Sequence, residues 1–266
     1  MTGAAEQAEG IIAIEHVTKS FATKRRATAV LRDVSLSVVP GEFVSLLGPS
    51  GCGKTTLLNL VAGFAAPDSG SVKYAGERIT RPNSKVGYLT QDDALLPWRN
   101  VRANVALPLQ IKGVDRAQRA ADADRLLGRV GLRGFEDHYP HQLSGGMRKR
   151  VGLARTLIYH PQTLLLDEPF GALDAQTRVL MQRELLSLVR SLQLTVLLVT
   201  HDLNEAIGLS DRIVLFSRRP ASILEVYRLP RRAPEEIDGH GSRDDTVYAA
   251  IWERLSRELD PPGVDT

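Results

Sequence analysis

The chain begins with segments in which apolar and polar residues alternate, and it later contains short segments that are almost entirely apolar. A period of two is typical of strands with one exposed face, and it predicts strands over residues 11–20 and 34–39. Continuous apolar segments are typical of strands that are buried on both faces of a parallel sheet. They predict strands over residues 43–47, 163–166 and 194–199, and shorter strands are predicted over 70–74 and 85–89.

Helices are predicted where apolar residues recur every three or four positions, or where a strand ends in a helix-start signal. Residues 56–62 follow the strand at 43–47, and residues 144–159 form a second candidate. A third candidate covers residues 115–130, where Gly131 is a suitable stop and the helical spacing involves Ala120, Ala123, Leu127 and Val130. The last predicted helix, over residues 243–259, would have one face lined by Tyr248, Ile251, Trp252, Leu255 and Leu259.

The order of these elements predicts an α/β fold. Strands that alternate with helices form a mostly parallel sheet with right-handed crossovers. The helical character of residues 92–158 suggests an insertion into that sheet. We therefore expect four parts, which are an N-terminal part of the core at 11–91, an inserted helical part at 92–158, the rest of the core at 159–217 and a basic tail at 218–266.

Composition narrows the protein class without changing this fold prediction. The chain has 266 residues, of which 43% are hydrophobic, so it can bury a sizeable core. A net charge of +3 gives no case for nucleic-acid binding, and a single cysteine fits a reducing compartment. The first ten residues lack the apolar segment of a signal peptide, and no apolar stretch reaches the roughly 18 residues of a membrane span. We expect a cytoplasmic protein that reaches a membrane only through a partner.

The segment GPSGCGKTT, which follows the strand at 43–47, has the pattern of a phosphate-binding loop. It fits G-x-x-x-x-G-K-[ST], with a strand before it and a helix after it, as this motif requires. Backbone N–H groups and the helix N-terminus would bind the phosphates, Lys54 would reach the β- and γ-phosphates, and Thr55 would offer its hydroxyl to Mg²⁺. The alternative is a glycine-rich turn with a chance lysine. The candidate ligands are Gly48, Pro49, Ser50, Gly51, Cys52, Gly53, Lys54, Thr55 and Thr56. For Cys52 a redox role is the alternative to a small, tolerated residue.

Acidic and imidazole side chains follow the two later buried strands. Asp167 and Glu168 end the strand at 163–166, and His201 follows the strand at 194–199. Ligands of open α/β sheets bind at the carboxyl ends of the strands, so these residues are expected at one edge. Asp167 would hold Mg²⁺ through water, Glu168 would polarise the attacking water, and His201 would lie near the γ-phosphate. Without the phosphate loop, these residues would be explained by a common Asp-Glu-Pro turn after a strand and by a hydrogen-bonded histidine on the surface.

One further motif makes the chain resemble the ATP-binding cassette (ABC) ATPases. Leu143-Ser144-Gly145-Gly146-Met147 resembles their signature motif, and the two motifs above resemble their Walker A and Walker B segments. Residues 171–174 (GALD) resemble the D-loop, and His201 resembles the switch histidine. The resemblance covers residues 11–217 and implies a P-loop NTPase (RecA-like) core with an antiparallel β subdomain and an inserted helical subdomain. It also implies ATP and Mg²⁺ as ligands, Gln91 as a nucleotide and metal contact, and Phe21 as the aromatic residue that stacks on adenine.

The signature motif predicts a dimer. Ser144, Gly145 and Gly146 begin a helix, so they form a second anion site. The resemblance implies that this site covers the ATP held by another copy in a head-to-tail homodimer. Met147 and Lys149 depart from the glutamines common in the family, but the serine and glycines that meet phosphate are kept. Phe21 replaces the commoner tyrosine and keeps a stacking face.

The segment after Gln91 points to a membrane partner. In the family this region contacts a permease, and Leu95, Leu96 and Trp98 suit a docking groove, although a locally buried loop is the alternative. The segment resembles the importer subgroup for nitrate, sulfonates and taurine, which implies a permease, an indirect link to a solute-binding protein, and a place on the cytoplasmic face of the membrane. A soluble ABC protein that acts on ribosomes or DNA is the rival hypothesis. The helix of the basic tail is open to three roles, which are packing on the core, docking and regulation. The basic residues of the tail could meet anionic lipid or a regulator, and a solvated face is the alternative; they are Arg218, Arg219, Arg231 and Arg232.

Overall fold

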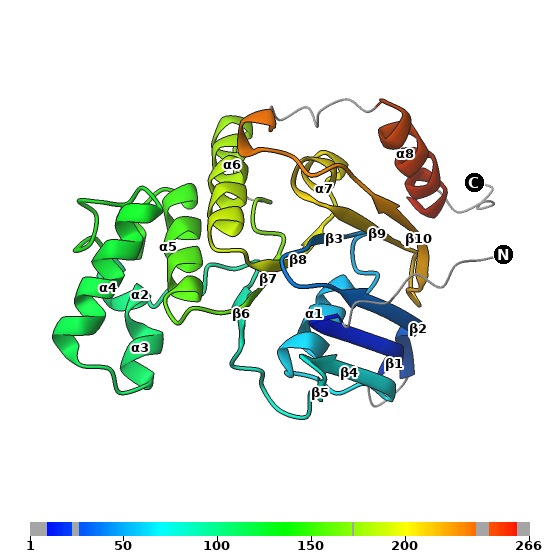
Figure 1. The fold of residues 1–266 in the computed structure, drawn as a ribbon, viewed down its shortest axis with the longest axis horizontal. Helices are drawn as coiled ribbons and strands as arrows, with labels where there is room; N and C mark the ends of the chain where they lie inside the picture. Colours follow the sequence, from blue (N-terminus) through cyan, green and yellow to red (C-terminus); the bar gives the residue numbers. More distant parts are fainter. Residues whose placement is uncertain (1–9, 23–26, 172, 238–244, 260–266) are drawn as a thin grey trace.

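The apolar segments of the sequence form neighbouring strands of one sheet. The computed structural model describes residues 10–22, 27–171, 173–237 and 245–259, and its larger sheet has six strands in the order β10-β9-β3-β8-β7-β6 (Figure 1). The pairs β9–β3, β3–β8, β8–β7 and β7–β6 are parallel, whereas β10 pairs antiparallel with β9 at one edge. The strands are β3 (Phe43–Leu47), β6 (Val86–Leu89), β7 (Thr163–Asp167), β8 (Thr195–Thr200), β9 (Arg212–Phe216) and β10 (Ile223–Arg228). The prediction of a mostly parallel sheet is confirmed.

The alternating segments form a second, antiparallel sheet in the order β2-β1-β4-β5. Its strands are β1 (Ile12–Ala22), β2 (Ala27–Val38), β4 (Ser69–Tyr74) and β5 (Glu77–Arg78). β2 begins earlier than the strand predicted over 34–39, because Val30 and Leu31 also bury their side chains against the sheet's core. The short β5 was not predicted. The antiparallel subdomain expected from the family resemblance is present.

Successive residues of the central strands face opposite layers. Leu165 packs with the antiparallel sheet and with α1 (Lys54–Ala62), which lies between the two sheets. Leu164 and Leu166 point the other way and pack with the helices on the far face. Because side chains alternate along a strand, a strand covered on both faces is apolar at every position. This is why the apolar segments predicted the core correctly.

Helices fill the chain between β6 and β7, and they form the separate lobe at the left of Figure 1. They are α2 (Val101–Val105), α3 (Leu107–Ile111), α4 (Arg116–Arg129) and α5 (Gly145–Leu157), with a 3₁₀ turn η1 (Pro140–Gln142). Side-chain caps fix three of the four helix starts, since Asn100 accepts from the N–H of Ala103 at 2.9 Å, Asp115 from that of Ala117 at 2.8 Å and Ser144 from that of Met147 at 3.3 Å. The helices expected over 115–130 and 144–159 are present, and α2 and α3 were not predicted.

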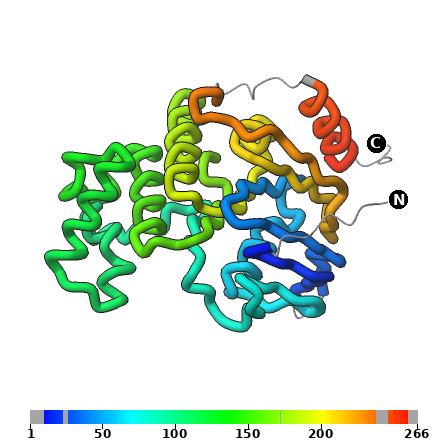
Figure 2. The backbone as a smooth tube through the Cα atoms, in the orientation of Figure 1, coloured from blue at the N-terminus to red at the C-terminus, as the bar shows by residue number. Residues whose placement is uncertain are grey.

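Two helices and two strands in the last third of the chain were also missed. They are α6 (Ala175–Ser191), α7 (Leu203–Leu209), β9 and β10, followed by a 3₁₀ turn η2 (Pro234–Glu236). α6 covers the face of the sheet beside the helical lobe, through Met181, Leu185 and Val189. The backbone trace returns from β9 through β10 and over the top of the molecule, so the tail runs beside α6 and α7 (Figure 2).

The last helix, α8 (Asp245–Leu259), packs on α7 and on the strands beside it. Of the five apolar residues predicted to line one face of this helix, two meet the core and three do not. Ile251 and Leu255 are buried, whereas Tyr248, Trp252 and Leu259 are exposed. The rings of Tyr248 and Trp252 stack on each other with centroids 6.5 Å apart, because residues four apart lie one above the other on a helix. Residues 243 and 244 of the predicted helix, and the segment tested for a signal peptide apart from Gly10, lie outside the described residues.

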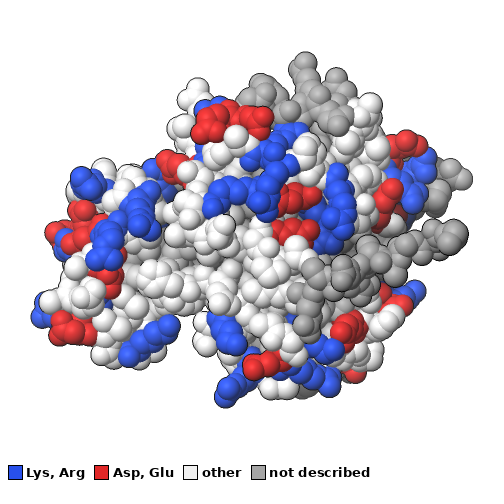
Figure 3. Space-filling model, viewed as in Figure 1, with Lys and Arg blue, Asp and Glu red and all other residues white. Residues whose placement is uncertain are grey.

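Charges of both signs are mixed on the face shown in Figure 3. Two basic residues of the tail form ion pairs within the chain. Arg218 pairs with Glu258 of α8 at 3.6 Å, and Arg231 pairs with Asp211 at 3.4 Å. These contacts favour packing among the three roles considered for the tail. Across the ranges described above, no helix combines the length and the apolar character that crossing a membrane requires.

Candidate functional site

The phosphate loop, residues 48–55, joins the carboxyl end of β3 to α1. The helix begins at Lys54, two residues earlier than predicted, so Lys54 and Thr55 belong to its first turn. Gly53 precedes it with φ 130°, a conformation that favours glycine. A Cβ at Gly53 would also lie 2.7 Å from Cγ1 of Val30, so a larger residue would displace the loop from the antiparallel sheet.

Lys54 is folded back into this loop. Its side chain is buried, with 4% of the residue exposed, and Nζ donates to the carbonyl oxygens of Gly48 at 2.7 Å and Pro49 at 2.8 Å. Ser50, Gly51 and Thr55 are exposed around it. A buried ammonium with only neutral acceptors is incompletely neutralised, which favours an anion at this position. Burial raises the pKa of the neighbouring Cys52 thiol, as suits a small structural residue.

Thr55 and Asp167 meet across the edge of the sheet. The hydroxyl of Thr55 donates to Oδ1 of Asp167 at 3.1 Å. Asp167 is buried, and burial raises the pKa of its carboxyl group despite the hydrogen bond from Thr55. A buried carboxyl group beside a hydroxyl fits Mg²⁺, which takes one or two protein oxygens together with substrate phosphates and water. Among the described residues there is no cluster of three or more His, Cys, Asp or Glu side chains that could hold a metal by themselves.

Glu168 and His201 form the second pair at this edge. Nδ1 of His201 lies 3.3 Å from Oε1 of Glu168, and both residues follow parallel strands. Glu168 has φ 45°, which is uncommon for a residue with a side chain, and its N–H donates to the carbonyl of Val199 at 2.9 Å. Sparsely populated backbone conformations cluster at functional sites. The carboxylate is thus held beside the imidazole by a backbone turn that strand propensity alone does not select.

The remaining predicted residues lie around these pairs. Phe21 is at the end of β1 with 47% of its surface exposed, and Nζ of Lys19 is 5.4 Å from the centroid of its ring. Gln91 is exposed after β6, and its side chain makes no hydrogen bond to Thr55 or Asp167. Thr56 is partly buried in α1.

The signature residues lie at the start of α5 and take no part in the hydrogen bonds within the phosphate loop. Ser144 caps the helix, and Gly145 and Gly146 form its first turn. A Cβ at Gly146 would lie 2.8 Å from Cγ2 of Thr177, so a larger residue would displace Thr177 where α5 meets α6. The described chain has no hydrogen bond between Ser144 and residues 48–55. The two predicted anion-binding positions are therefore separate within one copy.

Sequence reasoning missed the residues that tie α5 to the segment after Gln91. Lys149 is buried, pairs with Asp93 at 3.2 Å and donates to the carbonyl of Gln91. Arg148 also pairs with Asp93 at 3.2 Å, and Arg155 donates to the carbonyl of Ala94 at 2.7 Å. The only signal in the sequence was a lysine where the family commonly has glutamine. It marks a link between the signature helix and the predicted docking segment.

Comparisons with known proteins agree with this geometry. The family described as ABC transporter matches residues 31–171. The taurine import ATP-binding protein TauB of Escherichia coli O157:H7 is 48% identical over 234 residues, which cover 88% of this chain and 89% of that protein. An ABC transporter ATP-binding protein of Methanocaldococcus jannaschii, MJ0412, is 43% identical over 223 residues and 84% of each chain.

Solved structures of an ATP-binding cassette have the same fold. A dimeric, post-hydrolysis state of the cassette MJ0796 bound to ADP and Pi has a TM-score of 0.74 and 31% identity, and it covers 83% of this chain and 100% of that one. A second dimeric structure of MJ0796, a bacterial ABC transporter cassette, has a TM-score of 0.74 and 32% identity, with the same coverage. The phosphate loop, the two residue pairs and these relatives lead to one conclusion, which is that the chain belongs to the ABC transporter family as an ATP-binding ATPase subunit.

Proposed function

We propose that this chain is the ATP-hydrolysing subunit of an importer for taurine, another sulfonate, nitrate or a similar small solute. The relatives named as taurine import proteins support import over action on ribosomes or DNA. The observation that carries the proposal is the alignment of the phosphate loop with the pairs Thr55–Asp167 and Glu168–His201 at one edge of the parallel sheet.

Each side chain at this edge has a separate proposed role in phosphoryl transfer. Lys54 exchanges its two carbonyl acceptors for phosphate oxygens, which are stronger partners for an ammonium group. Glu168 accepts a hydrogen bond from the attacking water and orients it. His201, next to Glu168, donates towards the γ-phosphate. Mg²⁺, held by Thr55 and Asp167 with Gln91 as a further oxygen donor, would neutralise charge on the phosphates.

We further propose that the working unit is a head-to-tail homodimer. Ser144, Gly145 and Gly146 would bind the γ-phosphate of ATP held by the other copy, while Phe21 stacks on adenine within its own copy. The dimeric structures of MJ0796 support this arrangement. ATP would stabilise the closed pair and hydrolysis would release it, which is a population shift driven by nucleotide.

The partner that moves the solute would be a separate membrane permease. Trp98 has 71% of its surface exposed, whereas Leu95 in the same segment is partly buried against the core. The segment therefore offers an exposed aromatic side chain for a partner to bind, and the core holds its backbone in place. Docking there would place the chain on the cytoplasmic face of the membrane. A solute-binding protein would act only through the permease.

The proposal is tested by uptake of labelled solutes into cells that lack this chain. We expect uptake of taurine, of a simple alkanesulfonate or of nitrate to stop on deletion and to return with the intact chain. The solute whose uptake responds identifies the substrate. Uptake that is unchanged for all three would contradict the proposed function.

A further inference from the structure

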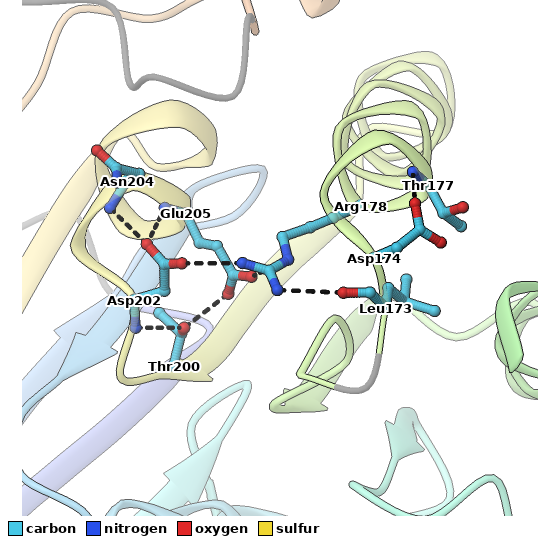
Figure 4. A network of polar contacts seen from close by, with 8 residues as sticks. All are labelled: Leu173, Asp174, Thr177, Arg178, Thr200, Asp202, Asn204 and Glu205. Atoms are coloured by element: carbon cyan, nitrogen blue, oxygen red, sulfur yellow. Dashed lines mark hydrogen bonds and ion pairs between the residues drawn. The ribbon is translucent and has the colours of Figure 1, made fainter.

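The segments that follow β7 and β8 are joined at two places. The first junction is the contact of Glu168 with His201 at 3.3 Å. The second is made by Arg178, a residue in the first turns of α6, which reaches across to α7 and to the segment after β8 (Figure 4). Nothing in the proposed chemistry uses Arg178, yet it contacts both segments that carry the reaction residues.

The guanidinium group of Arg178 spans the two segments. Nη2 donates to the carbonyl of Leu173 at 3.1 Å, on the side that follows Glu168. Nη1 donates to Oδ2 of Asp202 at 3.3 Å, on the side of His201, as drawn in Figure 4. Arginine can do this because its donors point in fixed, divergent directions from one plane. A lysine ammonium has no such fork.

Both sequence neighbours of His201 belong to this network. The hydroxyl of Thr200 donates to Oε2 of Glu205 at 2.7 Å and accepts from the N–H of Asp202 at 3.0 Å. Oδ1 of Asp202 caps α7 by accepting from the N–H groups of Asn204 at 2.8 Å and Glu205 at 3.3 Å. A displacement of Asp202 therefore moves the backbone that carries His201.

The other end of the bridge is equally anchored. Asp174 caps α6 by accepting from the N–H of Thr177 at 3.0 Å, and its carbonyl accepts from the N–H of Arg178 at 2.9 Å. Leu173 is buried, so its carbonyl is held in a fixed place. The carbonyl of Leu173 and the capped start of α6 are thus both linked to Arg178, which connects them to the His201 segment.

One donor of the bridge is left without a close partner. Nε of Arg178 is buried, has no hydrogen bond among the described residues, and lies 3.9 Å from Oε1 of Glu205. Glu205 is itself buried, and burial raises its pKa to about 7. Buried donors are normally satisfied, and Oε1 of Glu205 is the acceptor that faces Nε at 3.9 Å.

We propose that Arg178 is a positioning residue for ATP hydrolysis, which couples the Leu173–Asp174 segment to the loop that carries His201. When α6 and α7 approach, Nε gains Glu205 as a partner and His201 is drawn into a fixed position beside Glu168. When they separate, the bridge loosens and the pair loses its alignment. This inference rests on the proposed ATPase function.

The test compares Arg178→Met with Arg183→Met, a matched change on the same helix. Arg183 makes its hydrogen bond to the carbonyl of Ile237 at 2.7 Å, away from both loops. For Arg178→Met we expect kcat to fall about tenfold to a hundredfold with little change in KM for ATP, because misplacement of reacting groups by about 1 Å costs that much. Arg183→Met is expected to keep both constants. Arg178→Lys, which keeps the charge and is the fallback if Arg178→Met does not fold, is expected to lose part of kcat.

A second measurement is made without nucleotide, so that it reports position rather than turnover. The ring Cε1–H resonance of His201, assigned by its loss in His201→Gln, is expected to shift in Arg178→Met and to a smaller degree in Arg178→Lys, but not in Arg183→Met. Unchanged kcat, a change confined to KM, or a fall in kcat with an unmoved His201 resonance would each overturn the proposal. Wild-type protein without turnover would contradict the proposed function itself, whereas normal wild-type turnover with a fully active Arg178→Met would contradict only the role of Arg178.

Discussion

Replacing Glu168 by Gln is expected to lower ATP turnover at least about a hundredfold while Mg-ATP still binds, because a positioned general base contributes roughly 10²–10⁴-fold to rate. The amide keeps the shape of the carboxylate, and its oxygen still reaches Nδ1 of His201, which now lies 3.3 Å from Oε1. The substituted side chain cannot accept the proton of water as it attacks. ATP should therefore persist in the site and hold the closed homodimer together.

The measurement is phosphate release, paired with sedimentation in the presence and absence of Mg-ATP. Glu184→Gln is the matched control, since Glu184 is a carboxylate on α6 that pairs with Arg150 at 2.9 Å. The control should retain wild-type turnover and no ATP-dependent dimer trap. Normal turnover in Glu168→Gln would remove Glu168 from its assigned role, and a monomer at saturating Mg-ATP would argue against the sandwich.

Replacing Lys54 by Ala is expected to weaken ATP binding by about a hundredfold or more and to stop turnover. Truncation of one partner of a buried, charge-assisted hydrogen bond costs about 2–5 kcal/mol, and each 1.4 kcal/mol is roughly a factor of ten in affinity. In the free protein, the same change leaves the carbonyls of Gly48 and Pro49 without the Nζ donor. Binding should be measured with a fluorescent ATP analogue by titration.

Lys85→Ala is the control for this prediction, because Lys85 is an exposed lysine whose ammonium group is 4.0 Å from Glu77. It should bind ATP as the wild type does. Thermal unfolding of each variant separates loss of binding from loss of fold. An affinity for ATP within about twofold of wild type in folded Lys54→Ala would show that the lysine does not meet the phosphates.

The sequence predicted the parallel core and the phosphate loop because both depend on local signals. Strands buried on two faces are apolar at each position, and the loop needs glycines and a lysine at fixed spacing. The sequence did not predict the start of α1 at Lys54 or the left-handed backbone of Glu168, because both depend on tertiary structure. A Cβ at Gly53 would lie 2.7 Å from Cγ1 of Val30, and the N–H of Glu168 donates to the carbonyl of Val199 on the neighbouring strand. The helix α6 was predictable from its cap, Asp174, and its apolar spacing, and was missed.

Contacts between distant segments account for what the sequence could not supply. Lys149 meets Asp93, and Arg178 meets Asp202, only because α5 and α6 pack beside particular loops. Neither pairing leaves a pattern in a single sequence. The exposed stack of Tyr248 on Trp252 is a similar case, because helical spacing places both residues on α8 but does not decide which part of its apolar face meets the core.

Lys54 of one copy and Ser144 of the other are proposed to complete the same ATP site, and this arrangement can be tested directly. Two heterodimers, each isolated with two different affinity tags, test it by distributing the same two substitutions differently. In the first, one copy carries Lys54→Ala and the other carries Ser144→Arg, so one composite site is intact. In the second, a single copy carries both substitutions and its partner is wild type, so both composite sites are damaged.

ATP turnover of the two heterodimers is the most direct measurement. The first heterodimer should hydrolyse ATP and the second should not. If each copy instead completed its own site, the wild-type copy of the second heterodimer would remain active and the first would be inactive. Turnover by the second heterodimer equal to or above that of the first would show that the two copies do not share their ATP sites.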